Sequence, residues 1–225
     1  MKMIDMNFNW DWHSHLSVLK FFVNEYEICD CVEHGTGIHS TPLLKSGCEN
    51  YYGLEENEMF MQEMIDTGVY LESDVELLNT PDGVEIFTRY SDFTDHQQFE
   101  LNQIYSKKRT DIGYDMTACG GFKLLFVDGY AGTRNAFFEK VYDLFDIIIL
   151  HDTEPGSYET EYQYTFKSEK YKELFNIYSV TTPVPYTSFM VRKNIPINTD
   201  VLRRYMDEYC DMLEWEHEKM DILIH

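Results

Sequence analysis

The stretch CVEHGTGIHSTPLL (residues 31–44) decides the fold. The apolar residues before it predict a strand that ends at Glu33, and a turn that contains Gly35 and Gly37 follows. Glycines allow a ligand to come close to the backbone, and the helix start indicated by residues 40–42 would offer unpaired N–H groups. The stretch therefore predicts a strand, a ligand-binding turn and a helix in succession.

Two carboxylates follow at the end of the next predicted strand. The run Tyr51-Tyr52-Gly53-Leu54 predicts that strand, and Glu55 and Glu56 come directly after it. An acidic residue about 20 residues beyond a glycine-rich turn is placed to accept hydrogen bonds from ribose hydroxyls. Together with the turn, this spacing predicts an α/β domain that binds a nucleoside.

Length and charge narrow the possible functions. A chain of 225 residues predicts one domain, 1–225, which is long enough to bury roughly 70% of its unfolded surface. Forty acidic residues against eighteen basic ones give a formal net charge of −22, which repels phosphate backbones and anionic lipids. The basic cluster at residues 107–109 is too short to reverse this. We therefore expect no nucleic-acid partner and no membrane partner.

Cysteines and the N-terminal stretch bear on the compartment. Five cysteines is an odd number in a chain too long for a small disulfide scaffold. The stretch MKMIDMNFNWDW lacks an apolar signal core, and no apolar run approaches ~18 residues. These features predict a soluble, cytoplasmic protein, and they leave its oligomeric state open.

Strand-like and helix-like runs alternate along the chain, which favours an α/β layer fold. Residues 91–121 are polar and suggest a hairpin or a variable loop over the site. We expect helices at residues 13–23, 57–65, 135–144 and 199 to about 222, and further strands at residues 84–90, 122–127, 146–150, 175–181 and 187–191. The last two strands suggest an antiparallel pair.

Polar residues end two of the apolar strands. Asp128 follows the buried run at residues 122–127, and His151 and Asp152 follow DIIIL at residues 146–150. Open α/β sheets bind ligands at this carboxyl edge. Asp128 and Asp152 predict a Mg²⁺ or Mn²⁺ site, since Mg²⁺ is usually held by one or two carboxylates plus waters. The alternative is that one or both cap a following helix.

The histidine at this edge is a candidate general base. An unperturbed pKa of about 6.5 suits His151 to take a proton from a hydroxyl. Adjacent strand residues face opposite ways, however, so His151 and Asp152 need not share a site. His13 and His15 fit no zinc-ligand spacing, and we interpret them as a polar edge.

Two further residues are candidate substrate contacts. Arg134 follows the glycine-containing loop after Asp128, where it would clamp a carboxylate or phosphate of the substrate or form a surface ion pair. Tyr158 is a candidate for stacking on a sugar or ring, although aromatic residues this frequent usually pack in the core.

The order of the elements resembles that of the class I S-adenosylmethionine-dependent methyltransferases, whose seven-stranded sheet ends in a reversed strand. The resemblance covers roughly residues 13–193 and rests on Glu33-His34-Gly35-Thr36-Gly37, on Glu55, and on the strand ends at residues 126–129 and 150–153. The sequence is also similar to a little-characterised methyltransferase-like group in bacteria and viruses. It further resembles metal-dependent sugar O-methyltransferases, which keep an aspartate after the fourth strand and another after the fifth.

The resemblance implies a Rossmann-like α/β fold with a seven-stranded, mostly parallel sheet, helices on both faces and a terminal antiparallel strand. It implies O-methyl transfer from S-adenosylmethionine to a hydroxyl of a small molecule or glycan, with sugars as the favoured acceptors. It implies that Asp128, His151 and Asp152 are the catalytic residues. The cofactor would contact Glu33, Gly35, Thr36, Gly37, Ser40, Thr41, Glu55 and Glu56.

Two alternatives remain open. One is a methyltransferase-like binding module without turnover, because an acidic residue for adenine is missing at clear spacing after the third strand, where only Asp92 or Asp95 is nearby. The other is a dinucleotide oxidoreductase, which ranks lower because Ser40 replaces the third glycine of the GxGxxG pattern.

Overall fold

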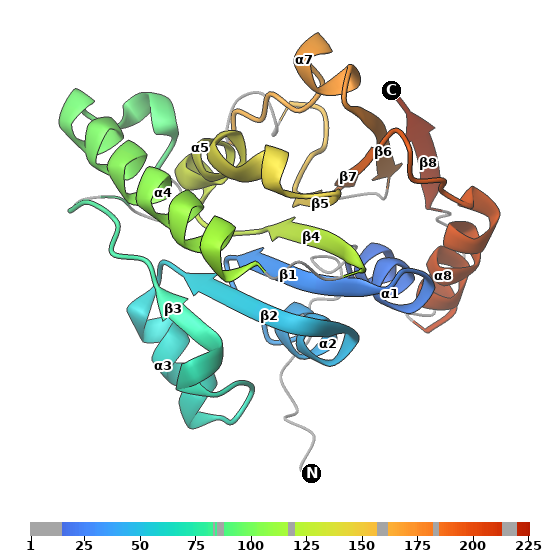
Figure 1. Cartoon of the computed structure of the whole chain (residues 1–225), viewed down its shortest axis with the longest axis horizontal. Helices are drawn as coiled ribbons and strands as arrows, with labels where there is room; N and C mark the ends of the chain where they lie inside the picture. The colour runs from blue at the N-terminus through green and yellow to red at the C-terminus, as the bar shows by residue number, and fades with distance from the viewer. Residues whose placement is uncertain are drawn as a thin grey trace.

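The computed structural model describes residues 15–82, 84, 88–116, 120–156, 162–181, 185–212 and 220–225. Its strands are β1 (Ile28–His34), β2 (Cys48–Glu55), β3 (Val75–Leu77), β4 (Phe122–Val127), β5 (Ile147–His151), β6 (Phe175–Thr181), β7 (Thr187–Arg192) and β8 (Asp221–Ile224). They form one eight-stranded sheet in the order β3-β2-β1-β4-β5-β7-β6-β8 (Figure 1).

The register of the parallel strands creates the edge on which the site is built. β1 pairs in parallel with β2 and with β4, so that His34 lies opposite both Leu54 and Val127. β4 pairs in parallel with β5, and Val127 lies opposite Leu150. The carboxyl ends of these four strands are therefore level, and the residues that follow them lie along one edge of the sheet.

The helices cover both faces of the sheet (Figure 1). The α-helices are α1 (His15–Glu25), α2 (Ser40–Gly47), α3 (Glu58–Asp66), α4 (Asp95–Asp115), α5 (Ala131–Val141), α7 (Glu169–Lys172) and α8 (Thr199–Met212), and the 3₁₀ turns are η2 (Glu72–Asp74), η3 (Tyr90–Asp92) and η4 (Tyr142–Leu144). α4 and α5 cover one face, and α1, α2 and α8 cover the other.

The central strands are apolar throughout because helices cover both faces of the sheet, so side chains on either face are buried in a core. In β4, Leu125 and Val127 pack in the core under α4 and α5, whereas Leu124 and Phe126 pack in the core under α1 and α8. This alternation follows from the two-residue period of a strand. It confirms the prediction of a buried strand at residues 122–127, which requires helices on both sides.

Two of the three C-terminal strands, β7 and β8, run opposite to the other strands of the sheet. β7 is antiparallel to both β5 and β6, as the sequence predicted. The prediction of a helix to about residue 222 is wrong at its end, because residues 221–224 form β8, antiparallel to β6; α8 is described from Thr199 to Met212, and residues 213–219 lie outside the described part. β8 supplies hydrogen-bond partners to an edge of β6 that would otherwise be open. The sheet therefore has eight strands instead of seven.

The third strand lies earlier than predicted. β3 is Val75–Leu77, which pairs in parallel with β2 from Gly53 to Glu55. Within the stretch 84–90, residues 84, 88 and 89 are not in a strand and Tyr90 begins a 3₁₀ turn, while residues 85–87 lie outside the described part. A three-residue edge strand is too short to show a period-2 pattern in the sequence.

Residues 91–121 contain a long helix where we predicted a hairpin or variable loop. α4 begins with a capping box, in which Gln97 N–H donates to Thr94 Oγ1 at 3.2 Å and Thr94 N–H donates to Gln97 Oε1 at 2.9 Å. Leu101, Tyr105 and Ile112 are buried along one face of the helix. This capping sequence is a helix signal that the polar composition obscured.

Among the described residues, no helix is long and apolar enough to cross a membrane.

Candidate functional site

The glycine turn after β1 packs against the loop after β4. Gly35 has a φ of +83°, and its N–H donates to the carbonyl of Leu54 at 2.8 Å. A Cβ on Gly35 would overlap the backbone of Asp128 and Gly129. Only glycine fits a position with both a positive φ and so close a backbone neighbour. The two loops therefore support each other, and the ligand-accessible part of the turn starts at Gly37.

Glu33 lies buried beneath this turn. Its Oε2 accepts hydrogen bonds from Thr41 Oγ1 at 2.7 Å and from the hydroxyl of Tyr51, and Thr41 Oγ1 in turn accepts from Gly37 N–H at 3.0 Å. Ser40 lies close enough to stabilise the ionised form, yet Oε1 has no donor in hydrogen-bond geometry. Burial outweighs these donors and raises the pKa of Glu33 to about 7.

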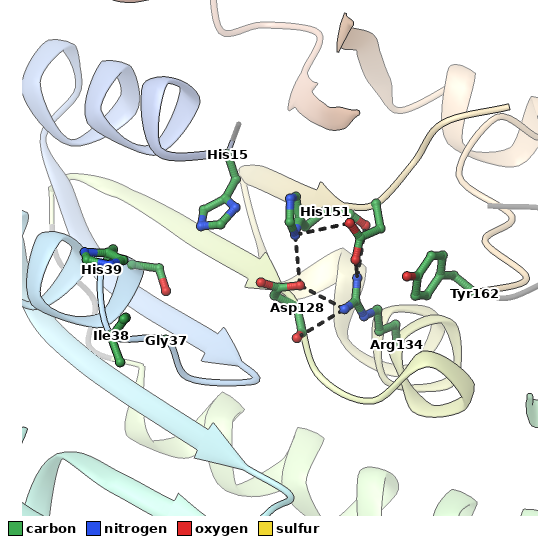
Figure 2. Close-up of a pocket in the computed structure, with 10 residues that line it drawn as sticks. His15, Gly37, Ile38, His39, Asp128, Arg134, His151 and Tyr162 are labelled. Atoms are coloured by element: carbon green, nitrogen blue, oxygen red, sulfur yellow. Dashed lines mark hydrogen bonds and ion pairs between the residues drawn. The ribbon is translucent and has the colours of Figure 1, made fainter. Parts of the chain in front are cut away.

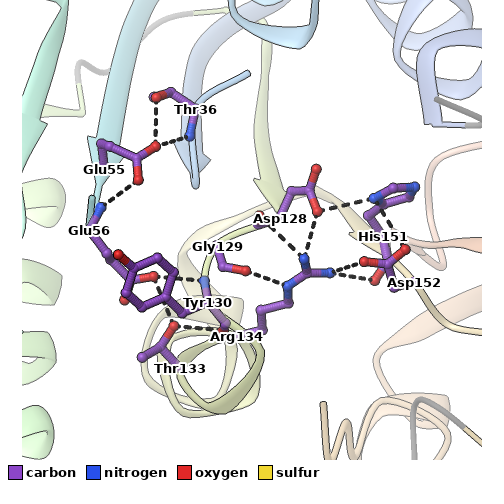
Figure 3. A network of polar contacts seen from close by, with 10 residues as sticks. All are labelled: Thr36, Glu55, Glu56, Asp128, Gly129, Tyr130, Thr133, Arg134, His151 and Asp152. Carbon is purple, nitrogen blue, oxygen red and sulfur yellow. Dashed lines mark hydrogen bonds and ion pairs between the residues drawn. The ribbon is translucent and has the colours of Figure 1, made fainter. Parts of the chain in front are cut away.

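Glu55 is held by the chain itself. Its Oε2 accepts from Thr36 N–H at 3.0 Å and from Thr36 Oγ1 at 2.8 Å, and its Oε1 accepts from Glu56 N–H at 2.9 Å (Figure 3). Oε1 also accepts from Asn57 N–H at 2.8 Å. These four bonds use the lone-pair sites of a carboxylate. Burial raises the pKa of Glu55 despite them. A ribose would reach Glu55 only after Thr36 gives up its two bonds.

Glu56 ties the end of β2 to α4 and α5. Its Oε2 accepts from Tyr130 N–H at 2.8 Å and from Thr133 Oγ1 at 2.9 Å, and its Oε1 accepts from the hydroxyl of Tyr105 at 3.0 Å. His34 Nε2 lies 3.4 Å from the same Oε1. Burial would raise the pKa of Glu56, but His34 and these donors hold it below its usual value. Every contact is internal, so the structure gives Glu56 a positioning role.

A second polar group lies at the ends of β4 and β5, and Figure 3 shows it apart from the Glu55 contacts. His151 Nδ1 lies 3.0 Å from Asp128 Oδ1 and 3.6 Å from Asp152 Oδ1. Asp152 has a φ of +56°, which turns the backbone out of the strand alternation. The two neighbours His151 and Asp152 therefore share one site. The structure thus brings Asp128, His151 and Asp152 together at this edge of the sheet.

Arg134 joins the two aspartates. Its Nη2 lies 2.9 Å from Asp128 Oδ1, and its Nη1 donates to Asp152 Oδ2 at 2.8 Å. The remaining N–H groups point to main-chain oxygens: Nε to Gly129 at 2.6 Å, Nη1 to His151 at 3.3 Å and Nη2 to Asp128 at 3.4 Å. All five guanidinium N–H groups thus have internal partners. Arg134 has none left to clamp a substrate anion, and it occupies the space between the carboxylates that a shared metal ion would need.

The charges in this group shift the protonation of its members. Burial alone would lower the pKa of His151, but the charges of Asp152 and Asp128 raise it. Burial alone would raise the pKa of Asp128 and of Asp152, but His151 and Arg134 lower both. Ionised aspartates next to a buried arginine are therefore the expected state of the site.

A cavity of about 230 Å³ connects the two halves of the site (Figure 2). Gly37 and Ser40 line it on the side of the glycine turn, and Asp128, His151 and Asp152 line it on the opposite side. The remaining lining residues are His15, Ile38, His39, Arg134 and Tyr162. The predicted cofactor turn and the predicted catalytic residues thus face one space.

Two histidines in this cavity were not predicted. His15, which we interpreted as part of a polar edge, is the first residue of α1, is 4% exposed and lies in contact with His151. His39 precedes α2 on the opposite wall. No local spacing marks either residue, because only the packing of α1 against the sheet brings His15 to this edge. Tyr158 lies outside the described residues.

Comparison with known proteins adds little to this geometry. No family model and no curated protein matches the chain. An rRNA methylase from Streptococcus thermophilus is similar in structure, with 12% sequence identity, a TM-score of 0.41 and coverage of 79% of this chain and 95% of that chain. Similarity at this level does not indicate what the present chain binds.

Proposed function

We propose that this chain is an S-adenosylmethionine-dependent methyltransferase that methylates a hydroxyl of a small molecule or glycan, with sugars as the favoured acceptor class. The observation that carries the proposal is the cavity shared by the turn at Gly37 and Ser40 and by Asp128 and His151. A cofactor seated on the turn would direct its methyl group into the same space as an acceptor held at the ends of β4 and β5.

The residues of the turn fit the amino-acid end of this cofactor. Glu33 Oε1 is a buried carboxylate oxygen without a donor, beneath a turn that lines the cavity, and an ammonium group would complete its hydrogen bonds. When bound, S-adenosylmethionine supplies a methyl group on a positively charged sulfur. The ribose end fits less directly, because Thr36 has to release Glu55 first.

The opposite wall favours an uncharged acceptor. The N–H groups of Arg134 all have partners within the protein, and its single positive charge balances only one of the two negative charges of Asp128 and Asp152. A phosphate or carboxylate would meet repulsion there, whereas a neutral hydroxyl would find acceptors for its hydrogen bond. In the proposed reaction, His151 or Asp128 would accept the proton of a hydroxyl that binds at this wall.

Ligand binding and turnover test the proposal in two steps. We expect S-adenosylmethionine and S-adenosylhomocysteine to raise the unfolding temperature and NAD⁺ to leave it unchanged. Glu33→Gln should reduce the effect of S-adenosylmethionine, because it removes the charge that the ammonium needs. Transfer of a radiolabelled methyl group to a panel of neutral sugars, with sugar phosphates as comparison, then tests the acceptor class. Stabilisation by NAD⁺ alone would contradict the proposal.

A methyltransferase-like binding module is the second candidate. It is favoured by Glu55, whose four hydrogen bonds with the chain leave the predicted ribose contact closed. Such a module would bind an acceptor in the cavity with no dependence on S-adenosylmethionine. Calorimetric binding of a sugar whose affinity is the same with and without the cofactor, together with no methyl transfer, would favour this candidate.

A further inference from the structure

Three potential metal ligands converge in the cavity from three separate elements. His15 comes from the start of α1, Asp128 follows β4, and His151 ends β5. One ligating atom from each lies within 4.8 Å of the others. The rings of His15 and His151 meet edge to face with centroids 4.3 Å apart, and His151 Nδ1 lies 3.0 Å from Asp128 Oδ1. Figure 2 shows the three side chains directed toward one another.

These separations suit a metal ion with only small side-chain movements. Metal–ligand bonds of about 2.0–2.2 Å place neighbouring ligand atoms roughly 3–3.5 Å apart. The contact between His151 and Asp128 already has this length. His15 and His151 are 4% and 3% exposed, so their ring positions are held by packing around them. The second carboxylate oxygen of Asp128 points away from Arg134, on the side of His15 (Figure 2).

The chemistry of the three ligands selects the metal. Two imidazoles and one carboxylate suit Zn²⁺, Fe²⁺ or Mn²⁺, whereas Mg²⁺ and Ca²⁺ prefer a set made only of oxygen atoms. Three protein ligands beside a cavity leave a coordination position for a substrate oxygen or water, which is typical of catalytic rather than structural sites. Asp152 lies 3.6 Å from His151, and its charge is balanced by Arg134.

We propose that His15, Asp128 and His151 bind one divalent transition-metal ion, with an open position toward the cavity. This ligand set replaces the pair Asp128 and Asp152 that the sequence suggested. Asp152 instead pairs with Arg134, which neutralises it and holds the loop after β4 in place. Arg134 also lies 2.9 Å from Asp128 Oδ1, so it acts as a positioning residue for this ligand.

The consequence for catalysis rests on the proposed function. A bound metal ion lowers the pKa of a hydroxyl that coordinates it, so the acceptor would lose its proton at the open position. His151 would then act as a ligand, and a water molecule in the cavity would carry the proton away. Metal binding itself does not require S-adenosylmethionine or an acceptor, so it can be measured independently of methyl transfer.

The test measures metal content and unfolding temperature of the full chain without cofactor. Protein stripped with a chelator is dialysed separately against Zn²⁺, Fe²⁺ under anaerobic conditions, Mn²⁺ and Mg²⁺, and bound metal is counted by plasma mass spectrometry. We expect about one equivalent of at least one transition metal with a higher unfolding temperature, and no retained Mg²⁺. Co²⁺ as a probe should give a visible absorption spectrum of a nitrogen- and oxygen-ligated ion.

Matched variants separate this site from its alternatives. His15→Ala should lower metal affinity by more than the roughly 10–100-fold that loss of an outer hydrogen-bond partner causes. His39→Ala, in the same cavity but outside the ligand set, should keep the metal, and so should Asp152→Asn. Circular dichroism confirms that each variant is folded, and His15→Gln replaces His15→Ala if the latter unfolds.

Three results would overturn the inference: wild-type protein that retains no transition metal, undiminished retention in the folded His15 variant, or loss of the metal in Asp152→Asn with retention in the His15 variant. The last of these would restore the pair Asp128 and Asp152. Metal binding without binding of S-adenosylmethionine would leave the metal site in place and contradict only the proposed methyl transfer.

Discussion

Replacing Glu33 with glutamine tests how burial shapes the cofactor side of the site. The pKa of Glu33 is about 7 in the folded chain, against 4.5 for an exposed glutamate. At 1.36 kcal/mol per pKa unit, this pKa difference of about 2.5 corresponds to about 3 kcal/mol in the free energy of unfolding. The glutamine side chain keeps an oxygen that can accept from Thr41 and Tyr51, so the substitution removes mainly the titrating proton.

The sign of the effect follows from which state binds the proton. Below pH 4.5, Glu33 is neutral in both the folded and the unfolded chain and carries no penalty. Between pH 4.5 and 7, the unfolded chain ionises while the folded chain retains its proton, so the stability of the folded chain falls as the pH rises. Above pH 7 the penalty is constant. Relative to wild type, Glu33→Gln should therefore gain about 3 kcal/mol of unfolding free energy between pH 4 and pH 8.

Urea denaturation of both proteins at several pH values measures this difference directly, because contributions from other titrating groups cancel between them. Tyr51→Phe provides a second check, since its hydroxyl lowers the pKa of Glu33 and its removal should shift the transition to higher pH. A difference between Glu33→Gln and wild type that stays flat from pH 4 to pH 8 would show that Glu33 does not titrate in this range, and the role assigned to its burial would be wrong.

Three further substitutions have defined outcomes. Gly35→Ala should destabilise the chain by roughly 1–3 kcal/mol more than Gly68→Ala in denaturation experiments, because both have a positive φ but only Gly35 faces backbone atoms; equal effects would mean that the loops can separate freely. Arg134→Met should cost about 3–5 kcal/mol of stability by leaving two buried carboxylates without their cation, against at most about 1 kcal/mol for the more exposed Arg109→Met. Glu55→Ala should weaken S-adenosylmethionine binding by about 1–3 kcal/mol in calorimetry, and an unchanged affinity would remove Glu55 from the cofactor site.

The sequence predicted the central strands well because their pattern has few alternatives. A short run of apolar residues between glycines, as at residues 122–127, is typical of a strand that is buried on both faces. α4 was missed since most of its residues are polar and its buried face consists of widely spaced residues such as Leu101 and Tyr105. β8 was missed because the amphipathic pattern of residues 199–222 runs into the first residues of this strand.

In the candidate site too, the sequence predicted some residues well and others poorly. Asp128 directly follows β4 and His151 is the last residue of β5, so strand direction alone brings their side chains to one edge. Arg134 and Glu55 have longer side chains, and the groups that they meet depend on loops that close over them. The number of internal hydrogen bonds that each makes cannot be read from a linear pattern, and this number is what removes Arg134 from substrate binding.

The pairing of Arg134 with Asp128 and Asp152 also determines the net charge of the cavity wall. With its guanidinium balancing one of the two aspartates, Asp128 and Asp152 leave one net negative charge at the cavity wall when His151 is neutral, in addition to the titrating carboxylate of Glu33 beneath the turn. Such a cavity attracts cations and neutral hydroxyl groups and repels anions. A sulfonium cofactor, a divalent metal ion and a neutral acceptor all satisfy this condition, so one electrostatic feature of the chain supports both proposals without making either depend on the other.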